Sequence, residues 1–380
     1  MIRSCQHREE GKNLCYYVSK EDVNYMGLLD LSKIMGHARP FFAWQVELTT
    51  RCPLKCRMCI REGAVNWQAM DMKLEDFRRI SEYFSKAENI ILQGWGEPLL
   101  YRNLIGAVRI VKEKGARAGF VTSGSGLERA LISELIDAGT DFIGFSLAGA
   151  VAQTHNSIRI HSDFELLIEN IRLFNTIKKE KRLDKPGLHL AYLALRDNIT
   201  DVPALVELAD LTGINEVILI NLIQVSNEWQ EAQRVFSCTE EGMKTEYADI
   251  LKGAEIRAKE LNVNLRISSL FPADVPVCEE NPLRNVYISA EGEVSPCVYL
   301  NPPLPGPIKR IYCGDEFQTG KAGFGNILQE PFDTIWGSAG YAEFRECFEK
   351  RLKHPKALSL SDTQFRPPVQ CRTCHKMLGL

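Results

Sequence analysis

Three cysteines in the first part of the chain stand close enough together to hold one small metal centre. Cys52, Cys56 and Cys59 form a C-x3-C-x2-C array directly after the strand-like run at 44–48. A four-iron cluster has four corners, so three thiolates leave one iron open to a non-protein ligand. Structural zinc normally takes four protein ligands. The open corner is therefore the informative feature, and the alternatives are three structural thiols or a zinc site with a distant fourth ligand.

A glycine-containing turn follows the next apolar run of the sequence. It reads Gly94-Trp95-Gly96-Glu97-Pro98 and comes directly after residues 89–93. Glycines let a backbone approach a ligand closely, and the neighbouring carboxylate can accept a hydrogen bond from an ammonium group. Alone, this pattern also describes an ordinary tight turn. Its place one strand after the cysteine loop makes it a candidate ligand site.

The remaining cysteines fall into two further clusters and five single positions. A chain of 380 residues without a secretory signal uses clustered cysteines for metal more often than for disulfides. The clusters are Cys278 with Cys297 and Cys371 with Cys374. We expect plain thiols at the single positions, although Cys313 or Cys347 could replace one ligand of a C-terminal metal site. The single positions are Cys5, Cys15, Cys238, Cys313 and Cys347.

Alternating strands and helices are predicted to position these residues. Helical apolar stripes separate the strands, which implies parallel strands with right-handed crossovers. Six such units are fewer than the eight of a complete barrel. In sheets of this kind the chemistry lies at the carboxyl ends of the strands, where the cysteine loop and the glycine turn are found. The expected strands are 44–48, 89–93, 118–122, 141–147, 188–195 and 216–223.

The pattern changes in the last third of the chain. Residues 239–261 favour a long helix, and the runs at 286–290 and 294–300 flank Glu291-Gly292 as a β-hairpin. We expect a Pro-rich loop and a long irregular stretch from residue 301 to about residue 324, and a helix over 331–350. Residues 1–40 are interpreted as an extension with one short helix.

Composition limits the partners. The net charge is −3 and apolar residues make up 45% of the chain, so the sequence favours neither a nucleic-acid partner nor an anionic membrane partner. The first residues carry no apolar stretch that could act as a signal peptide, and no apolar run approaches the length of a membrane span. We therefore expect a cytoplasmic protein.

The cysteine loop and the glycine turn together resemble the radical S-adenosylmethionine (SAM) superfamily. This resemblance implies a partial (β/α)6 barrel of the TIM type, a [4Fe-4S] cluster on the three cysteines, and SAM bound to the open iron. Reductive cleavage of SAM would then give a 5′-deoxyadenosyl radical. By the same resemblance, the turn holds the SAM amino group, Ser146 contacts the ribose and Arg159 contacts the carboxylate. The family often has an acidic residue near Ser146, where this chain has Ala148. The SAM-contacting residues implied are Met58, Gly94, Gly96, Glu97, Ser123, Ser146 and Arg159.

The C-terminal cysteines resemble the SPASM/twitch extension of the same superfamily. A cysteine on each side of a hairpin and a later C-x2-C pair bind an auxiliary [4Fe-4S] cluster there. Because the chain ends six residues after Cys374, the shorter form with one auxiliary cluster fits better, and structural zinc is the alternative. The implied domains are an extension (1–40), the barrel (41–265) and a small α+β iron–sulfur domain (266–380).

The resemblance implies an oxidising enzyme that receives electrons from a flavodoxin- or ferredoxin-type donor. The favoured substrate is a peptide or protein, which the enzyme would oxidise or cross-link as a maturase. The 51 residues before Cys52 look short for the leader-binding domain that peptide-modifying members often carry. The alternatives are a small-molecule dehydrogenase or cofactor-biosynthesis enzyme and, from another class, a non-catalytic electron-transfer protein. The turn at 94–98 argues against that last class, because an electron carrier needs no amino-group site.

Overall fold

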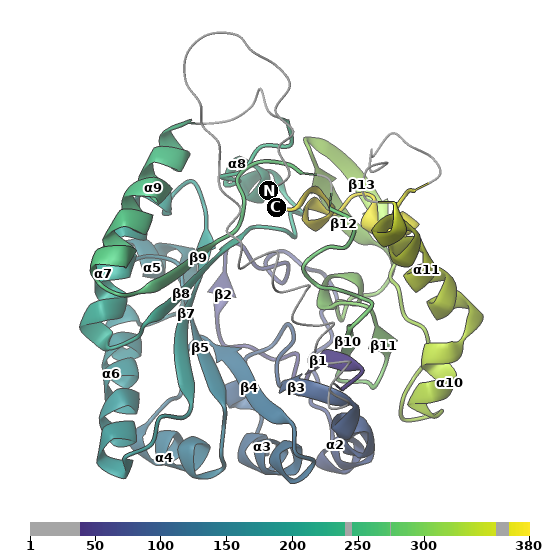
Figure 1. Ribbon diagram of the computed structural model, residues 1–380, viewed down its shortest axis with the longest axis horizontal. Helices are drawn as coiled ribbons and strands as arrows, with labels where there is room; N and C mark the ends of the chain where they lie inside the picture. The colour runs from purple at the N-terminus through teal and green to yellow at the C-terminus, as the bar shows by residue number, and fades with distance from the viewer. Residues whose placement is uncertain (1–38, 240–244, 274, 355–364) are drawn as a thin grey trace. The chain divides into compact units, whose positions relative to one another are not determined.

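The structure, a computed structural model, describes residues 39–239, 245–273, 275–354 and 365–380. The short helix expected within residues 1–40 lies outside the described residues. Residues 41–380 form one compact unit, which is built around a single curved sheet with helices along its outer side (Figure 1).

The sheet has nine strands in the order β11-β10-β1-β3-β4-β5-β7-β8-β9. Every neighbouring pair is parallel except β10 with β11. The six strands expected from the sequence are the six central strands of this sheet. The edges of the sheet stay open, so the barrel is incomplete. The predicted partial (β/α)6 barrel is therefore confirmed. The central strands are β1 (Phe41–Val46), β3 (Ala87–Ile91), β4 (Arg117–Thr122), β5 (Phe142–Leu147), β7 (Gly187–Ala194) and β8 (Glu216–Asn221).

Three further strands extend both edges of this sheet. β9 (Asn264–Ile267) was not predicted by the sequence analysis, and it pairs with β8. The expected hairpin forms from β10 (Asn285–Ile288) and β11 (Val294–Ser295), and β10 pairs in parallel with β1. The segment assigned to a small C-terminal domain thus begins inside the barrel sheet. Its boundary at residue 266 stays a prediction.

The helices between the strands carry the apolar stripes that the sequence showed. Phe77, Ile80 and Phe84 are buried on α2 and the 3-10 helix η1 that continues it. The described part of the helix expected from residue 239 begins at residue 245. The helices are α2 (Leu74–Ile80), η1 (Ser81–Lys86), α3 (Leu104–Glu113), α4 (Arg129–Asp137), α5 (Ala152–Ile158), α6 (Phe164–Lys181), α7 (Val202–Thr212), α8 (Glu228–Ala232) and α9 (Thr245–Glu260).

The C-terminal part contains short elements beside the sheet. The helix expected over 331–350 is divided at Ser338, whose extended backbone separates α10 (Phe332–Gly337) from α11 (Ala339–Lys353). Short 3-10 turns complete the fold, and none of the described helices is long and apolar enough to cross a membrane. These turns are η2 (Pro98–Leu100), η3 (Ile199–Asp201), η5 (Val298–Leu300), η7 (Val369–Cys371) and η8 (His375–Leu378).

The prediction of an irregular stretch before residue 324 was wrong in part. β12 (Ile308–Tyr312) and β13 (Asp315–Thr319) form an antiparallel hairpin there. The two residues between them, Cys313 and Gly314, both have positive φ, at 54° and 95°. Tight hairpin turns require this conformation and are usually marked by Asn-Gly or Asp-Gly. With cysteine at the first position, the sequence does not carry the usual turn signal.

Candidate functional site

The cysteine loop is held by a short strand pair at the carboxyl end of β1. β2 (Lys55–Cys56) pairs antiparallel with β6 (Arg159–Ile160), and the Arg57 amide donates to the Ile158 carbonyl at 3.0 Å. This pairing brings the Arg159 guanidinium to the loop, with Nη1 3.9 Å from the Cys56 Sγ. Arg61 closes the loop from its other end, because its Nη2 donates to the Cys52 carbonyl at 3.0 Å.

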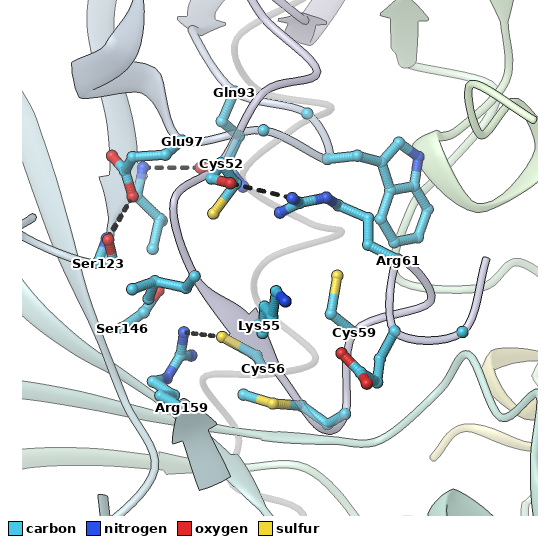
Figure 2. A pocket seen from close by; sticks show the side chains of 18 residues that line it. Cys52, Lys55, Cys56, Cys59, Arg61, Gln93, Glu97, Ser123, Ser146 and Arg159 are labelled. Carbon is cyan, nitrogen blue, oxygen red and sulfur yellow. Dashed lines mark hydrogen bonds between the residues drawn. The ribbon is translucent and has the colours of Figure 1, made fainter. Parts of the chain in front are cut away.

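All three loop cysteines open into one cavity of about 480 Å³. Its walls come from the cysteine loop and from the ends of β3, β4 and β5 (Figure 2). Every residue that the sequence assigned to the first cluster or to SAM lines this cavity, so the structure brings the whole set together; their roles remain predictions. They are Cys52, Cys56, Met58, Cys59, Gly94, Gly96, Glu97, Ser123, Ser146 and Arg159.

Burial disfavours the charged form of two loop thiols. It raises the pKa of Cys52 above the usual range and raises that of Cys59 to about 11. A nearby metal centre reverses this preference, because a bound cation stabilises thiolate and releases the proton. The loop is therefore suited to thiols that ionise when a metal centre is assembled.

The glycines of the turn are required by close packing against the chain that leads into the cysteine loop. A Cβ on Gly96 would lie 2.2 Å from the Thr49 carbonyl oxygen, and one on Gly94 would lie 2.3 Å from Glu47 Oε1. Real Cβ atoms do not approach other atoms so closely. The Glu97 amide also donates to the Arg51 carbonyl at 2.8 Å. The turn and the cysteine loop therefore form one packed unit.

Glu97 is buried and both of its carboxylate oxygens accept hydrogen bonds. Oε1 accepts from the Leu99 amide at 3.1 Å and from Thr122 Oγ1 at 2.5 Å, and Oε2 accepts from the Ser123 amide at 2.8 Å and its hydroxyl at 2.7 Å. A carboxylate has about four acceptor directions. An ammonium group at Glu97 would therefore replace one of these donors or share an oxygen with it. The carboxylate fixes the turn to the end of β4.

Arg159 carries unused hydrogen-bonding capacity. Its Nε is buried and has no hydrogen-bond partner among the residues that the structure describes, although buried polar groups are almost always paired. The guanidinium lines the cavity beside Cys56, where a carboxylate could accept from it. Three thiols and a guanidinium around one cavity fit a cluster with an open corner and a ligand that carries an anionic group.

Four C-terminal cysteines share a second neighbourhood. Cys278 lies in the loop before β10, Cys297 follows β11, Cys371 ends η7 and Cys374 immediately precedes η8. Burial raises the pKa of Cys278 to about 12 and that of Cys371 well above the usual range. After burial, the charges of the other three thiols are the next causes of the raised pKa of Cys371, so all three lie near it. These residues fit a closed site with four thiolate ligands.

Among the described residues, one group of three or more His, Cys, Asp or Glu side chains has all its ligand atoms within 4.8 Å of one another, and it contains none of the seven cluster cysteines.

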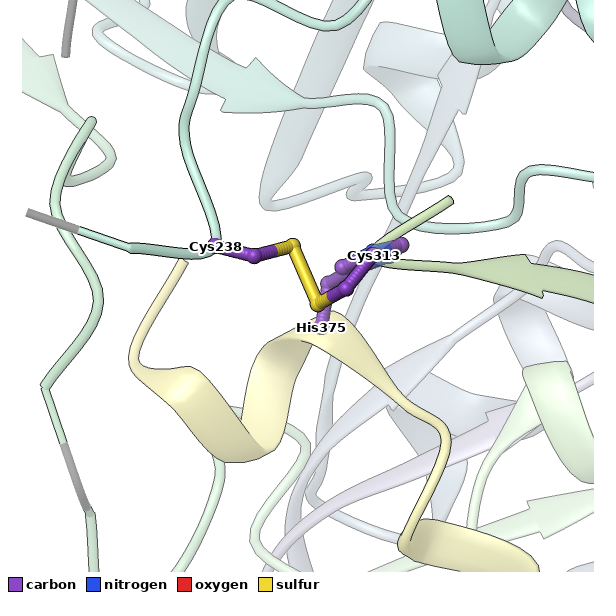
Figure 3. A group of neighbouring side chains, drawn as sticks. All are labelled: Cys238, Cys313 and His375. Carbon is purple, nitrogen blue, oxygen red and sulfur yellow. A yellow bond between two sulfur atoms is a disulfide. The ribbon is translucent and has the colours of Figure 1, made fainter. Parts of the chain in front are cut away.

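Two cysteines expected to stand alone are close neighbours, which corrects that prediction. Cys238 follows α8 and Cys313 lies in the β12–β13 turn, 75 positions away, and their sulfur atoms are joined in a disulfide (Figure 3). His375 completes the group of three. Their sequence separation explains why the spacing gave no signal. Cys347 lies on α11, where its charged neighbours are Glu343, Glu346, Lys350 and Arg372.

Sequence reasoning also missed residues that shape the first cavity. Glu47, at the end of β1, is buried, and its Oε1 accepts from the Trp95 amide at 2.7 Å. Gln93 accepts from the Val121 amide at 2.7 Å and ties β3 to β4. Lys55 and Arg61 add positive charge to the lining. Glu47 and Gln93 each lie at the end of an expected strand, which was the available signal.

Comparisons with known protein families match two parts of the chain. Residues 46–209 match the radical SAM superfamily, and residues 278–375 match the SPASM iron–sulfur cluster-binding domain.

Several characterised proteins are similar to this chain. The tungsten-containing aldehyde ferredoxin oxidoreductase cofactor-modifying protein of Pyrococcus furiosus is 25% identical over 79% of this chain and 82% of its own. The PqqA peptide cyclase of Granulibacter bethesdensis is 27% identical, over 50% of this chain and 49% of its own. The structure of Streptococcus suis SuiB bound to the precursor peptide SuiA has a TM-score of 0.59 at 13% identity, covering 99% of this chain and 78% of that one. At that identity the likeness shows the fold alone.

Proposed function

Because the chain belongs to the radical SAM superfamily of enzymes and carries a SPASM domain, we propose that it is a maturase that oxidises or cross-links a peptide or protein. The cofactors expected from the sequence, SAM with its [4Fe-4S] cluster and an auxiliary [4Fe-4S] cluster, are those that these domains bind. When bound, the first cluster and SAM supply a 5′-deoxyadenosyl radical that removes a hydrogen atom from substrate.

The observation that carries the catalytic part of this proposal is the shared cavity. Cys52, Cys56 and Cys59 would hold the first cluster from one side of it. Arg159 would donate to the SAM carboxylate, since it lines the cavity with its guanidinium beside Cys56. The backbone at Gly94 and Gly96 would lie against the amino end. Met58, Ser123 and Ser146 would line the nucleoside part of the same cavity, where a flexible thioether can pack against adenine.

The C-terminal thiols would hold the cluster that accepts an electron from the substrate. Cys278, Cys297, Cys371 and Cys374 would saturate one auxiliary cluster, which leaves no open iron for substrate. Such a closed cluster is suited to accept or relay the electron released when the substrate is oxidised. A flavodoxin- or ferredoxin-type protein would deliver electrons to the first cluster.

Two observations bear on the substrate class. A peptide substrate is supported by the similarity to a peptide cyclase, which covers half of this chain. A cofactor or other small molecule is the second candidate. It is supported by the cofactor-modifying relative, to which the chain is similar over a larger share of both sequences.

One assay separates the two candidates. The chain is reconstituted with iron and sulfide under anaerobic conditions, reduced, and supplied with SAM and a clarified extract of the source cells. We expect the extract to increase the rate of 5′-deoxyadenosine formation, and we expect protease treatment of the extract to remove the increase. An increase that survives protease would favour the small molecule and contradict the peptide proposal.

A matched pair of variants controls this assay. Cys56→Ser removes a proposed cluster ligand and should abolish 5′-deoxyadenosine formation. Cys347→Ser changes a thiol on α11 outside both proposed ligand sets and should leave the rate unchanged. Formation of 5′-deoxyadenosine by the Cys56→Ser variant at the unmodified rate would contradict the assignment of the first cluster.

A further inference from the structure

A third group of metal-binding side chains contains none of the proposed cluster ligands. Cys238 follows α8, Cys313 lies in the β12–β13 turn, and His375 begins η8 (Figure 3). One ligand atom from each lies within 4.8 Å of the other two. The two sulfur atoms are bonded to each other in this structure. Three segments that are distant in sequence thus present two sulfurs and an imidazole to one point.

The two ring nitrogens of the histidine in this group have different surroundings. The His375 side chain is 1% exposed, and its Nδ1 lies 3.3 Å from the Ile223 carbonyl oxygen. That contact makes Nδ1 the donor and leaves the lone pair on Nε2, which is buried and has no hydrogen-bond partner in the described part of the chain. Metal-binding histidines typically donate their second ring N–H to a backbone carbonyl in this way. The Nε2 lone pair is therefore available to a metal ion.

A guanidinium and an apolar cluster surround the Cys238 sulfur. The Arg234 Nη1 lies 3.5 Å from the Cys238 Sγ, where it can donate to a thiolate, and the same guanidinium is paired with Glu231. Phe236, Leu378 and Leu380 form a buried apolar cluster against which Cys238 and Tyr312 pack. An apolar shell of this kind limits the access of water to a metal site.

We propose that the reduced chain binds one zinc ion through the Cys238 and Cys313 thiolates and His375 Nε2. Two thiolates and one imidazole are a common zinc donor set, and they leave the fourth tetrahedral position to water or another small ligand. The seven cluster cysteines can bind iron only as thiolates, so the enzyme is assembled under conditions that also favour the reduced form of this pair. This last step rests on the proposed function, whereas the geometry of the group does not.

The conversion from disulfide to zinc site balances with a dithiol as reductant. The dithiol gives two electrons and two protons to the Cys238–Cys313 bond and itself becomes a disulfide. Zinc then replaces the two thiol protons, which pass to solvent. Because His375 directly follows Cys374, the ion would fasten the segment that carries the C-x2-C pair to α8 and the β12–β13 hairpin.

Zinc content of the full chain tests the proposal. The chain is reconstituted anaerobically with iron and sulfide in the presence of dithiothreitol, incubated with zinc sulfate, desalted and analysed for metals. We expect about one zinc per chain. Its X-ray absorption spectrum should show two sulfur atoms at about 2.3 Å and a nitrogen atom at about 2.0 Å from zinc. The Cys238→Ser/Cys313→Ser variant should hold less than about a tenth of this zinc with unchanged iron. Cys347→Ser is the matched control and should keep both metals.

Three outcomes would overturn the proposal. If the wild-type chain binds no zinc, and peptide mapping finds Cys238 and Cys313 still linked after the reducing step, the pair is a structural disulfide. Zinc retained in the double variant would place the ion elsewhere. A shell of four sulfurs in the wild-type spectrum would place zinc in the auxiliary site, and this measurement needs no variant that folds. None of these results depends on SAM cleavage, so the proposed function is tested separately.

Discussion

At the scale of single residues, Gly96 determines how closely the glycine turn approaches the cysteine loop. A methyl group there would meet the Thr49 and Arg51 carbonyl oxygens at 2.2 and 2.7 Å. Both are backbone atoms, so the loop itself must move. We expect Gly96→Ala to destabilise the fold by about 1–3 kcal/mol and to reduce the iron bound at Cys52, Cys56 and Cys59. Iron content after reconstitution and the rate of 5′-deoxyadenosine formation measure both effects.

The chain offers a matched control for this substitution. Gly106 lies on α3, and a Cβ there meets no atom within 4 Å. Gly106→Ala should bind iron like the unmodified chain and gain up to about 1 kcal/mol from helix propensity. Equal iron content and equal rates in the two variants would show that the close approach at Gly96 has no consequence.

Glu47 provides a test of pH dependence. Burial raises the pKa of this carboxyl from 4.5 to about 7. The hydrogen bond from the Trp95 amide lowers the pKa, but the effect of burial is larger. Between these values the folded chain keeps a proton that the unfolded chain has lost. The contribution of Glu47 to stability is therefore fully present below pH 4.5 and falls by about 1.4 kcal/mol per pH unit until the pH passes 7.

The substitution Glu47→Gln removes this titration. In the unmodified chain, the Glu47 contribution should raise the thermal midpoint as the pH is lowered from 8 to 5.5. The difference between the midpoints of the two proteins should therefore change with pH in this range and become constant above about pH 7. Anaerobic thermal unfolding of both reconstituted proteins at several pH values gives this difference. A difference that is independent of pH would mean that Glu47 titrates in its ordinary range.

At the scale of elements, the pairing of β2 with β6 joins two distant parts of the sequence at the cavity. Residue pairs Lys55–Ile160 and Cys56–Arg159 form this pairing. It brings the Arg159 guanidinium to the cavity, beside the Cys56 sulfur. A hydrogen bond from a charged donor contributes about 1.5–3 kcal/mol, so we expect Arg159→Gln to weaken SAM binding by about ten- to a hundredfold. Equilibrium dialysis of SAM against the reconstituted variants measures this change.

An arginine elsewhere on the barrel controls for the lost charge. Arg109 is exposed on α3, and Arg109→Gln should bind SAM like the unmodified chain. Iron content must stay unchanged in the Arg159→Gln variant for the result to report on SAM. Weakening by less than about twofold, with full iron, would remove Arg159 from the carboxylate site.

The elements that the sequence predicted and those it did not differ in a physical way. Buried runs such as Ile143–Leu147 and helical stripes are local signals, and they gave the central strands and helices. β9 has alternating burial over only four residues, too short to stand out. The cysteine loop and the glycine turn are contiguous motifs and were predicted in full. Cys238, Cys313 and His375 meet only through tertiary packing, so no spacing pattern could join them.

At the scale of the whole molecule, one hydrogen bond connects the two proposed cluster sites. Trp95 lines the first cavity, and its Nε1 donates to the Val298 carbonyl at 3.3 Å, next to Cys297. The rings of Trp95 and Tyr299 also meet edge to face, with centroids 6.1 Å apart. β10, which precedes Cys297, is paired with β1, which leads into the cysteine loop. The same sheet therefore sets the geometry of both sites.

Because the sheet holds the first cluster site, we predict that the auxiliary cluster can be removed by substitution while the first cluster is kept. The thiols at Cys371 and Cys374 come from the end of the chain and belong to no strand of the sheet. The Cys371→Ser/Cys374→Ser variant should therefore bind about four irons instead of about eight. It should still form 5′-deoxyadenosine but yield no oxidised product, because no auxiliary cluster accepts the electron.

Iron content, 5′-deoxyadenosine and product are measured on the same preparations. The control is Cys347→Ser, which should leave all three quantities unchanged. The result separates two roles for the C-terminal site. If product forms at the unmodified rate with half the iron, the auxiliary cluster only supports the fold, and the electron must leave through the first cluster. If iron is unchanged, other residues hold the second cluster and the assignment of Cys371 and Cys374 is wrong. Loss of product with SAM cleavage retained fits only a site that takes part in the oxidation, because the sheet that positions SAM remains intact.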